Sequence, residues 1–308
     1  MSGLSPSDFE RLRTLRAESP AEVATALARR PRHAVPPADS RLFIVAADHP
    51  ARGALGVRAD ATAMEDRYEL LQRLAAALAN PAVDGVLGTA DILDDLAVLG
   101  LLDGKLAVGS LNRGGLRGST FELDDRFTAY GAGTRPAEGL DFTKLLVRIA
   151  LEDAATAATL ESAARAVGES AAAGIPIMIE PFMSRWIDGR VVNQLDPDSV
   201  ISSMAISAGL GTTSAYTWLK LPVVDEMERV MAATTLPTLL LGGDPDGSSD
   251  ETFSAWEHAL ALPGVRGLVV GRTLLYPVDD DVESAVATAA ALVHGPALPA
   301  RHAMKEPS

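Results

Sequence analysis

The chain has 308 residues, of which 47% are hydrophobic and 22% charged, and this balance excludes a disordered chain because the apolar surface suffices for a packed core. Its net charge of −14 argues against nucleic acid as a partner, since a polyanion would be repelled. The absence of cysteine excludes disulfides and thiol catalysis, and no run of about 18 apolar residues predicts a membrane span. We expect a cytoplasmic globular protein with no membrane partner.

Residues 1–40 are expected to form a short helical extension. Two segments begin with the pattern of a capping box, Ser7 with Glu10 and Ser19 with Glu22, in which each side chain accepts a hydrogen bond from a free backbone N–H. These helices would either cover the outside of the main domain or build a contact between subunits, and we expect a homo-oligomer.

Residues 41–295 alternate short apolar runs with longer amphipathic stretches, the pattern of repeated strand–helix units with a parallel sheet. The expected strands are 41–48, 83–89, 105–111, 142–149, 175–182, 216–224, 237–244 and 265–272. The expected helices are 62–79, 91–101, 122–138, 156–173, 198–209, 225–234, 250–261 and 280–293. Eight such units in about 250 residues predict an α/β fold, the (β/α)8 TIM barrel. A doubly wound open sheet is the alternative, but its usual glycine-rich first turn is missing. Residues 296–308 are expected to be a flexible tail.

Lysine is rare in this chain and occurs only at Lys105, Lys144, Lys220 and Lys305. Lys144 and Lys220 lie within apolar strands, and Glu180 lies on the strand between them. Reactive groups of a barrel gather at the C-terminal ends of its strands, and alternation along each strand can turn these three side chains inward. An amine buried beside another cation has a lowered pKa, so either lysine is a candidate nucleophile for a Schiff base.

The same residues have a structural alternative. A lysine on a strand can extend into solvent at the mouth of the barrel, or it can pair with Glu180 as a buried salt bridge. Two lysines beside one glutamate on consecutive strands, in a chain that otherwise avoids lysine, favour the functional interpretation.

Three more polar residues stand at or near the ends of strands. Asp48 is expected to orient a substrate hydroxyl or move a proton, and its alternative role is to cap the turn that follows. Arg148 shares a strand face with Lys144 and is expected to bind substrate. His49 is expected to be a hydrogen-bonded turn residue. The histidines show no zinc-binding spacing, so we expect neither a metal nor another cofactor.

Glycines end the last two strands. TLLLGGDPDG contains Gly242 and Gly243, and LVVGRT contains Gly271 and Arg272. The loops after the seventh and eighth strands of a barrel often hold a phosphate through backbone N–H groups. The alternative is a pair of ordinary turns with a solvated arginine, and the acids of GGDPDG would repel an anion.

These motifs together resemble the class I aldolases grouped with tagatose-bisphosphate, archaeal-type fructose-bisphosphate and deoxyribose-phosphate aldolases. The resemblance covers about residues 41–293 and rests on AADHPARGAL, the strand that carries Lys144, IMIEPF, WLKLPV and VVGRTLLY. The chain departs from it where DHPARG is two residues longer than the usual DQRG, and where GGDPDG has acids in place of small or polar residues. Within this superfamily it is most similar to an actinobacterial group that often accompanies inositol-catabolism genes.

The resemblance implies roles for individual residues. Lys220 would form the Schiff base, and Lys144 would tune it or bind substrate. Glu180 would act in proton transfer, and Asp48 would contact substrate hydroxyls. The implied phosphate site is formed by Gly243, Gly271 and Arg272.

The sequence therefore predicts a class I aldolase that cleaves or forms a C–C bond in a phosphorylated keto-sugar. The expected partner is a small-molecule sugar phosphate, and the resemblance implies a phosphorylated deoxy-keto-gluconate. The alternatives are a deoxyribose-phosphate-type aldolase, a non-catalytic sugar-phosphate-binding barrel, and a lyase or isomerase that uses Glu180 as a base without an imine.

Overall fold

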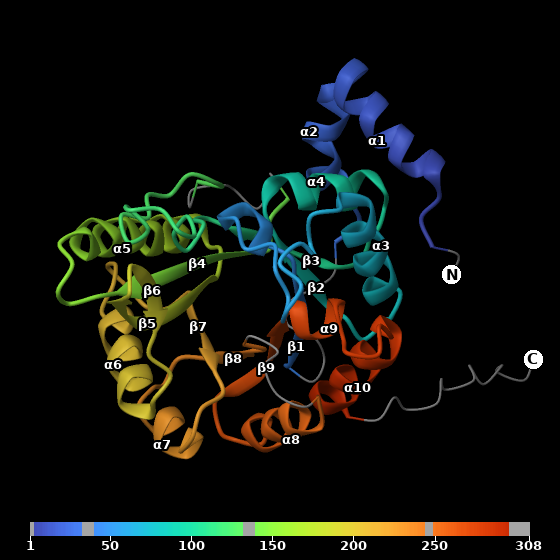
Figure 1. Ribbon diagram of the computed structural model, residues 1–308. Helices are drawn as coiled ribbons and strands as arrows, with labels where there is room; N and C mark the ends of the chain where they lie inside the picture. Colours follow the sequence, from blue (N-terminus) through green and yellow to red (C-terminus); the bar gives the residue numbers. More distant parts are fainter. Residues whose placement is uncertain (1–2, 33–39, 132–138, 244–248, 296–308) are drawn as a thin grey trace, which may run out of the picture.

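Eight parallel strands form a closed barrel in the computed structural model, which describes residues 3–32, 40–131, 139–243 and 249–295 (Figure 1). The strands follow one another around the ring in the order β4-β3-β2-β1-β9-β8-β7-β5. They are β1 (Leu42–Ala46), β2 (Gly85–Gly88), β3 (Leu106–Ser110), β4 (Phe142–Ile149), β5 (Ile177–Ile187), β7 (Thr217–Pro222), β8 (Thr238–Leu241) and β9 (Val265–Val270). Pairing of β4 with β5 closes the ring and excludes the doubly wound open sheet. The fold is a (β/α)8 TIM barrel.

Most helices surround this ring, and the first two along the chain lie farther out (Figure 1). They are α1 (Pro6–Glu18), α2 (Pro20–Arg29), the 3-10 helix η1 (His49–Arg52), α3 (Arg67–Leu78), α4 (Ala90–Val98), α5 (Ala155–Ala173), α6 (Pro197–Ala208), α7 (Met227–Ala232), α8 (Ser249–Leu260), α9 (Arg272–Leu275) and α10 (Val282–His294). None of the helices in the described ranges is long and apolar enough to cross a membrane. The expected domain boundaries after residues 40 and 295 stay predictions, and the expected tail lies outside the described residues.

Alternation along each strand divides the core into two layers. Leu42 and Ile44 of β1 point into the barrel, where they pack with side chains such as Met178 of β5. Phe43 and Val45 point outward into a cluster shared with the surrounding helices. Side chains on both faces of β1 are thus buried. For this reason the barrel strands read as continuous apolar runs, as is typical of a covered parallel sheet.

The fifth strand is longer than the expected 175–182. Its second half leaves the barrel and pairs antiparallel with β6 (Arg190–Asn193). Asp188 and Gly189 form the turn and both have positive φ, the conformation that a two-residue hairpin requires. Trp186 fastens the hairpin to the loop after β4, because its Nε1 donates a hydrogen bond to Oδ2 of Asp153 at 2.6 Å. The Asp-Gly pair was the sequence signal for this hairpin.

The N-terminal helices begin differently from the expected capping boxes. Ser5, not Ser7, precedes the first residue of α1, and its backbone N–H donates to Oδ2 of Asp8 at 2.8 Å. Pro6 fixes this start, because proline is favoured at the first helical position. Ser19 is the N-cap of α2 as expected, but its side chain makes no capping hydrogen bond, so the second box does not form.

The expected helix at 122–138 is absent from its described part, which ends at residue 131. Its acidic side chains turn inward instead. Glu122 pairs with Arg148 of β4, and Oδ2 of Asp125 accepts a hydrogen bond from Nδ2 of Asn112 at 2.7 Å. These contacts hold the segment against the ends of β3 and β4 as an irregular loop, so the prediction of a helix over these residues is wrong.

A buried arginine fastens the N-terminal helices to the barrel. Arg30 follows α2, is 5% exposed, and pairs with Asp141 just before β4. Its Nη1 also donates to the carbonyl oxygens of Leu27 and Gly139, at 2.8 and 2.5 Å. Arg32 pairs with the second carboxylate oxygen of Asp141. A largely buried ion-pair network therefore adds to the apolar contacts that Phe9, Leu12, Val23 and Leu27 make with the core.

Replacing Arg30 by methionine is expected to lower the free energy of unfolding by about 3–5 kcal/mol, because it removes one partner of a buried ion pair. Urea denaturation followed by circular dichroism measures the loss. Arg13→Met is the matched control, since Arg13 pairs with Glu10 on the surface, where a pair contributes about 0–1 kcal/mol. Equal losses in the two variants would show that Arg30 contributes no more than a surface pair.

Candidate functional site

Four charged side chains meet at the C-terminal end of the barrel. Lys144 lies between two carboxylates: its Nζ is 2.9 Å from Oδ2 of Asp48 and 2.7 Å from Oε2 of Glu180. The Nζ of Lys220 is 3.1 Å from the same Oε2 of Glu180. All four side chains are at most 10% exposed, so neither lysine extends into solvent. We call these four residues the lysine–carboxylate cluster.

The register of three neighbouring strands explains why the amines and Glu180 meet. Lys144 of β4 stands opposite Met178 of β5, which stands opposite Trp218 of β7. Met178 and Trp218 pack inside the barrel. Glu180 and Lys220 each follow these residues by two positions and therefore point to the same interior. Strand order and alternation together bring the three side chains into contact.

Burial and charge act in opposite directions on the two carboxylates of the cluster. Burial by itself would raise the pKa of Glu180, but the ammonium groups of Lys144 and Lys220 outweigh it and hold this pKa at about 2. Burial would also raise the pKa of Asp48, and the charge of Lys144 brings it far below its usual range. Both carboxylates are therefore ionised at neutral pH.

The pKa values of the two lysines are shifted in opposite directions from the ordinary value. Burial lowers the pKa of both amines. For Lys144 the charges of Asp48 and Glu180 outweigh burial and raise the pKa above its ordinary value. For Lys220 the charge of Glu180 opposes burial, but the ammonium of Lys144 reinforces it, and the pKa stays lowered. Lys220 is the amine that more readily reaches the neutral form, which is the nucleophilic one.

Asp48 follows β1 and precedes η1, yet its side chain makes no capping hydrogen bond, so the capping alternative is wrong. Its Oδ2 instead accepts a hydrogen bond from Oγ of Ser110 at 3.2 Å, in addition to its contact with Lys144. Ser110 is the last residue of β3 and is 1% exposed. Ser110 is not among the residues predicted from the sequence, although its place at the end of an apolar strand is the signal that pointed to the other residues.

Asn112 is a second residue that the sequence analysis missed. Its Nδ2 donates to the carbonyl of Leu146 at 2.7 Å, and its Oδ1 accepts from the backbone N–H of Leu146 at 2.9 Å. The side chain thereby continues the pairing of β3 with β4 past the end of β3. A single asparagine after an apolar strand gives no sequence signal for such a role.

His49 lies between the cluster and the last strand. Burial brings its pKa well below the usual value, so the imidazole is neutral. Its Nδ1 is 3.9 Å from Oδ1 of Asp48 and has no hydrogen-bond partner among the described residues. The ring packs closely against Gly271, where a Cβ would lie 3.1 Å from Cε1. His49 is nevertheless part of a hydrogen-bonded turn, as expected, because its backbone carbonyl accepts a hydrogen bond from the N–H of Ala54 at 3.4 Å.

The glycines after β8 and β9 lie side by side, because these two strands are neighbours. A Cβ on Gly242 would lie 2.5 Å from Cγ1 of Val270, and one on Gly271 would lie 2.4 Å from a carbonyl oxygen of β1, so a side chain at either position would clash. Gly243 has a φ of +68°, which favours glycine. Arg272 begins α9 beside them and is 8% exposed. We call Gly242, Gly243, Gly271 and Arg272 the glycine-rich edge.

Arg148 lies apart from the glycine-rich edge. It belongs to β4, which stands opposite β9 in the ring. The structure therefore brings the other candidate phosphate residues together and leaves Arg148 on the facing wall. Asp244 and Asp246, the acids expected to repel an anion at this edge, lie outside the described residues.

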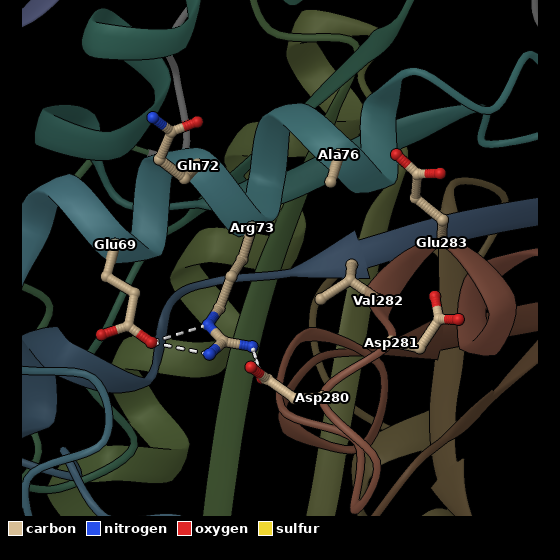
Figure 2. Close-up of a pocket in the computed structure, with 8 residues that line it drawn as sticks. All are labelled: Glu69, Gln72, Arg73, Ala76, Asp280, Asp281, Val282 and Glu283. Carbon is tan, nitrogen blue, oxygen red and sulfur yellow. Dashed lines mark hydrogen bonds and ion pairs between the residues drawn. The ribbon is translucent and has the colours of Figure 1, made fainter. Parts of the chain in front are cut away.

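A surface hollow of about 460 Å³ lies on the outside of the barrel, between α3 and the start of α10 (Figure 2). Arg73 points there toward Glu69 and Asp280 and pairs with them at 2.6 and 2.7 Å (Figure 2). Further acids line the hollow, so it would repel an anionic ligand. Across the described part of the chain, no group of three His, Asp or Glu residues is arranged to hold a metal ion.

A comparison with protein families shows to which family the chain belongs. A family model described as Cgl0159-like matches residues 40–290. The chain belongs to the Cgl0159-like family. The crystal structure of Cgl0159 from Corynebacterium glutamicum is similar over 94% of this chain and 98% of that one, with 63% sequence identity and a TM-score of 0.92. A search of curated proteins gave no match.

More distant structures share the fold of this Cgl0159-like chain. An archaeal fructose 1,6-bisphosphate aldolase matches 89% of the chain, over 100% of its own length, with 19% identity and a TM-score of 0.60. A Schiff-base-forming fructose-1,6-bisphosphate aldolase matches 88% of the chain, over 100% of its own length, with 20% identity and a TM-score of 0.59. The Cgl0159-like barrel is therefore similar in fold to class I aldolases.

Proposed function

We propose that the chain is a class I aldolase, which cleaves or forms a C–C bond in a phosphorylated keto-sugar through a Schiff base on Lys220. The observation that carries this proposal is the unequal pairing of the two amines around Glu180. Lys144 lies 2.9 and 2.7 Å from two carboxylates, whereas Lys220 lies 3.1 Å from one, and its burial beside the ammonium of Lys144 lowers its pKa. The fold shared with a Schiff-base-forming aldolase agrees with this assignment.

In the cleavage direction, the neutral Nζ of Lys220 attacks the ketone carbon to form a carbinolamine. The carbinolamine hydroxyl takes up a proton from solvent and leaves as water, which gives an iminium ion, and the final hydrolysis returns this proton. The bond between the carbon next to the iminium carbon and the hydroxyl-bearing carbon beyond it then breaks. Its electron pair moves into the iminium to give an enamine, while the hydroxyl on the departing carbon loses its proton and becomes an aldehyde. Glu180 accepts that proton, and Asp48 binds the substrate hydroxyls. Protonation of the enamine carbon and hydrolysis release the keto product and restore Lys220.

The low pKa of Glu180 favours this chemistry over a lyase or isomerase without an imine. A carboxylate with a pKa of about 2 is a weak base at neutral pH, so on its own it would remove a proton poorly. An iminium ion supplies the missing driving force, because it accepts the electron pair of the bond that breaks. Proton transfer to Glu180 then accompanies bond cleavage rather than preceding it.

We assign the substrate phosphate to the glycine-rich edge. At Gly243 no atom lies within 4 Å of where a Cβ would stand, so its backbone is open to a ligand, and Arg272 contributes a guanidinium, a group suited to phosphate. The resemblance to aldolases that accompany inositol-catabolism genes extends the proposal to a phosphorylated deoxy-keto-gluconate, with a deoxyribose phosphate as the alternative. A cytoplasmic homo-oligomer stays a prediction.

Reduction with sodium borohydride tests the proposal, because hydride converts an iminium ion into a stable secondary amine. The protein is treated with borohydride in the presence of dihydroxyacetone phosphate, or of a series of phosphorylated keto-sugars. The masses of its peptides are then measured by mass spectrometry. We expect an adduct on Lys220. Lys105 is an internal control, since burial lowers its pKa too, but it precedes β3 at the opposite end of the barrel.

Two other outcomes would change the assignment. An adduct on Lys144 alone would exchange the roles of the two lysines. Ligands that raise the melting temperature without leaving an adduct on either residue would favour a non-catalytic sugar-phosphate-binding barrel.

A further inference from the structure

The wall opposite the glycine-rich edge carries a separate basic group. Arg148 lies on the same face of β4 as Phe142 and Lys144, because residues an even number of positions apart on a strand share a face. Phe142 packs inside the barrel. Val147, in the other phase, packs outward with side chains of α5. Arg148 therefore faces inward, four positions and about 13 Å farther along the strand than Lys144, in the direction of the barrel mouth.

The loop after β3 holds Arg148 in this place. Its Nη1 pairs with Glu122, whose Oε2 accepts a hydrogen bond from the backbone N–H of Gly118 at 3.0 Å. A Cβ on Gly115 would lie 3.4 Å from Nη1 of Arg148, so the loop backbone also approaches this nitrogen, with no side chain between them at Gly115. The Nε of Arg148 has no hydrogen-bond partner among the described residues. One donor of a well-anchored guanidinium is thus unsatisfied.

Arg52 lies beside the same loop. It is the last residue of η1, and its carbonyl accepts a hydrogen bond from the backbone N–H of Arg117 at 3.0 Å. Its side chain is half-buried, and within the described ranges it pairs with no carboxylate. Its charge also adds to the effect of burial, which lowers the pKa of Arg148. Arg52 and Arg148 thus contact the same loop, the first through the backbone of Arg117 and the second beside Gly115.

The carboxylates nearby have other partners than Arg52. Glu122 is paired with Arg148. Oδ2 of Asp125 accepts a hydrogen bond from Nδ2 of Asn112. An oxyanion of a ligand would supply the missing charge, because a planar guanidinium binds a carboxylate or a phosphate through two parallel N–H···O bonds.

We infer that Arg52 and Arg148 form a second anion-binding subsite, which takes the end of the substrate that lies away from the glycine-rich edge. The substrate class is then a sugar phosphate with an oxyanion at both ends, the second being a carboxylate or another phosphate monoester. The inference rests on the proposed function for the place of the first phosphate, but its test requires no imine.

Titration calorimetry with three unreactive linear ligands tests the subsite. Glucitol 6-phosphate has one anionic end, gluconate 6-phosphate adds a carboxylate at the other end, and glucitol 1,6-bisphosphate adds a second phosphate there. None has a ketone that a lysine could attack. We expect one doubly anionic ligand or both to bind about 10- to 100-fold more tightly than glucitol 6-phosphate, the usual effect of a hydrogen bond to a charged group. The ligand that shows this preference identifies the oxyanion.

Three variants separate the subsite from a general effect of charge. Arg52→Met is expected to abolish the preference and to leave the affinity for glucitol 6-phosphate unchanged. Arg148→Lys keeps the charge beside Glu122 but loses the planar donor pair, and we expect it to lose most of the preference. Arg117→Met is the matched control, because it removes an exposed arginine from the same loop, and the preference is expected to remain.

The inference is overturned if the wild-type protein binds no doubly anionic ligand more tightly than glucitol 6-phosphate. It is also overturned if Arg52→Met and Arg117→Met reduce the preference equally. A preference that disappears in Arg52→Met, together with no borohydride adduct on any lysine, would leave the second subsite standing while the proposed function fails.

Discussion

Replacing Lys220 by methionine is expected to lower turnover by about 10⁴-fold or more, as the loss of a catalytic nucleophile commonly does. Borohydride trapping at this position should disappear as well. Methionine keeps the unbranched shape and removes the amine. Glu180 stays compensated in the variant, because Lys144 lies 2.7 Å from the same carboxylate oxygen, so we expect the fold to persist. Aldehyde release from a phosphorylated keto-sugar measures the rate, and thermal unfolding checks the fold.

Lys105→Met is the control for this variant. Lys105 donates hydrogen bonds to the backbone carbonyls of Asn80 and Val83, far from the cluster, and its loss should leave turnover unchanged. Near wild-type turnover in Lys220→Met would show that the imine forms elsewhere. Lys144 would then be the first residue to test.

Replacing Lys144 by methionine is expected to shift the pH dependence of turnover toward higher pH. The ammonium of Lys144 helps to lower the pKa of Lys220, and it also shares Glu180 with Lys220. Without it, the repulsion disappears and Glu180 interacts with Lys220 alone, so both changes stabilise the charged form of Lys220. Each unit by which the pKa of Lys220 rises lowers its neutral fraction at pH 7 about tenfold. The pH profile of kcat/KM reports the shift.

The same variant should also be less stable, because Asp48 and Glu180 lose the cation between them. Breaking a buried ion pair typically costs about 3–5 kcal/mol, which urea denaturation measures. Lys144→Arg keeps the positive charge and is expected to retain a pH profile near that of the wild type, even where its larger head group reduces kcat. A folded Lys144→Met protein with an unchanged pH profile would assign Lys144 a structural role only.

Most of the fold could be predicted from local patterns, because strands buried on both faces appear as short apolar runs. The segment LFIVA, for example, has no polar residue, since the helices cover one of its faces and the barrel interior covers the other. The expected helix at 122–138 is a segment for which such local patterns give the wrong structure. Its acids suit a solvated helix face, but Glu122 and Asp125 are buried by partners from β4 and the end of β3.

The candidate site divides in the same way. Alternation along single strands, combined with strand order, was enough to place Lys144, Glu180 and Lys220 together. Ser110 and Asn112 were missed, because their partners Asp48 and Leu146 lie 62 and 34 residues away in the chain. A hydrogen bond between residues that are distant in the chain leaves no periodic trace in the sequence.

By itself, the sequence determined the barrel, the strands that carry its charged residues and the two amines that flank Glu180, because all of these follow from short-range patterns. Only the tertiary structure decided that the two amines differ in pKa. Asp48 reaches Lys144 from β1, a strand that is not its neighbour, so Lys144 has two carboxylates within ion-pair distance and Lys220 has one. In a buried site the number of opposite charges within a few ångströms decides which amine keeps its proton.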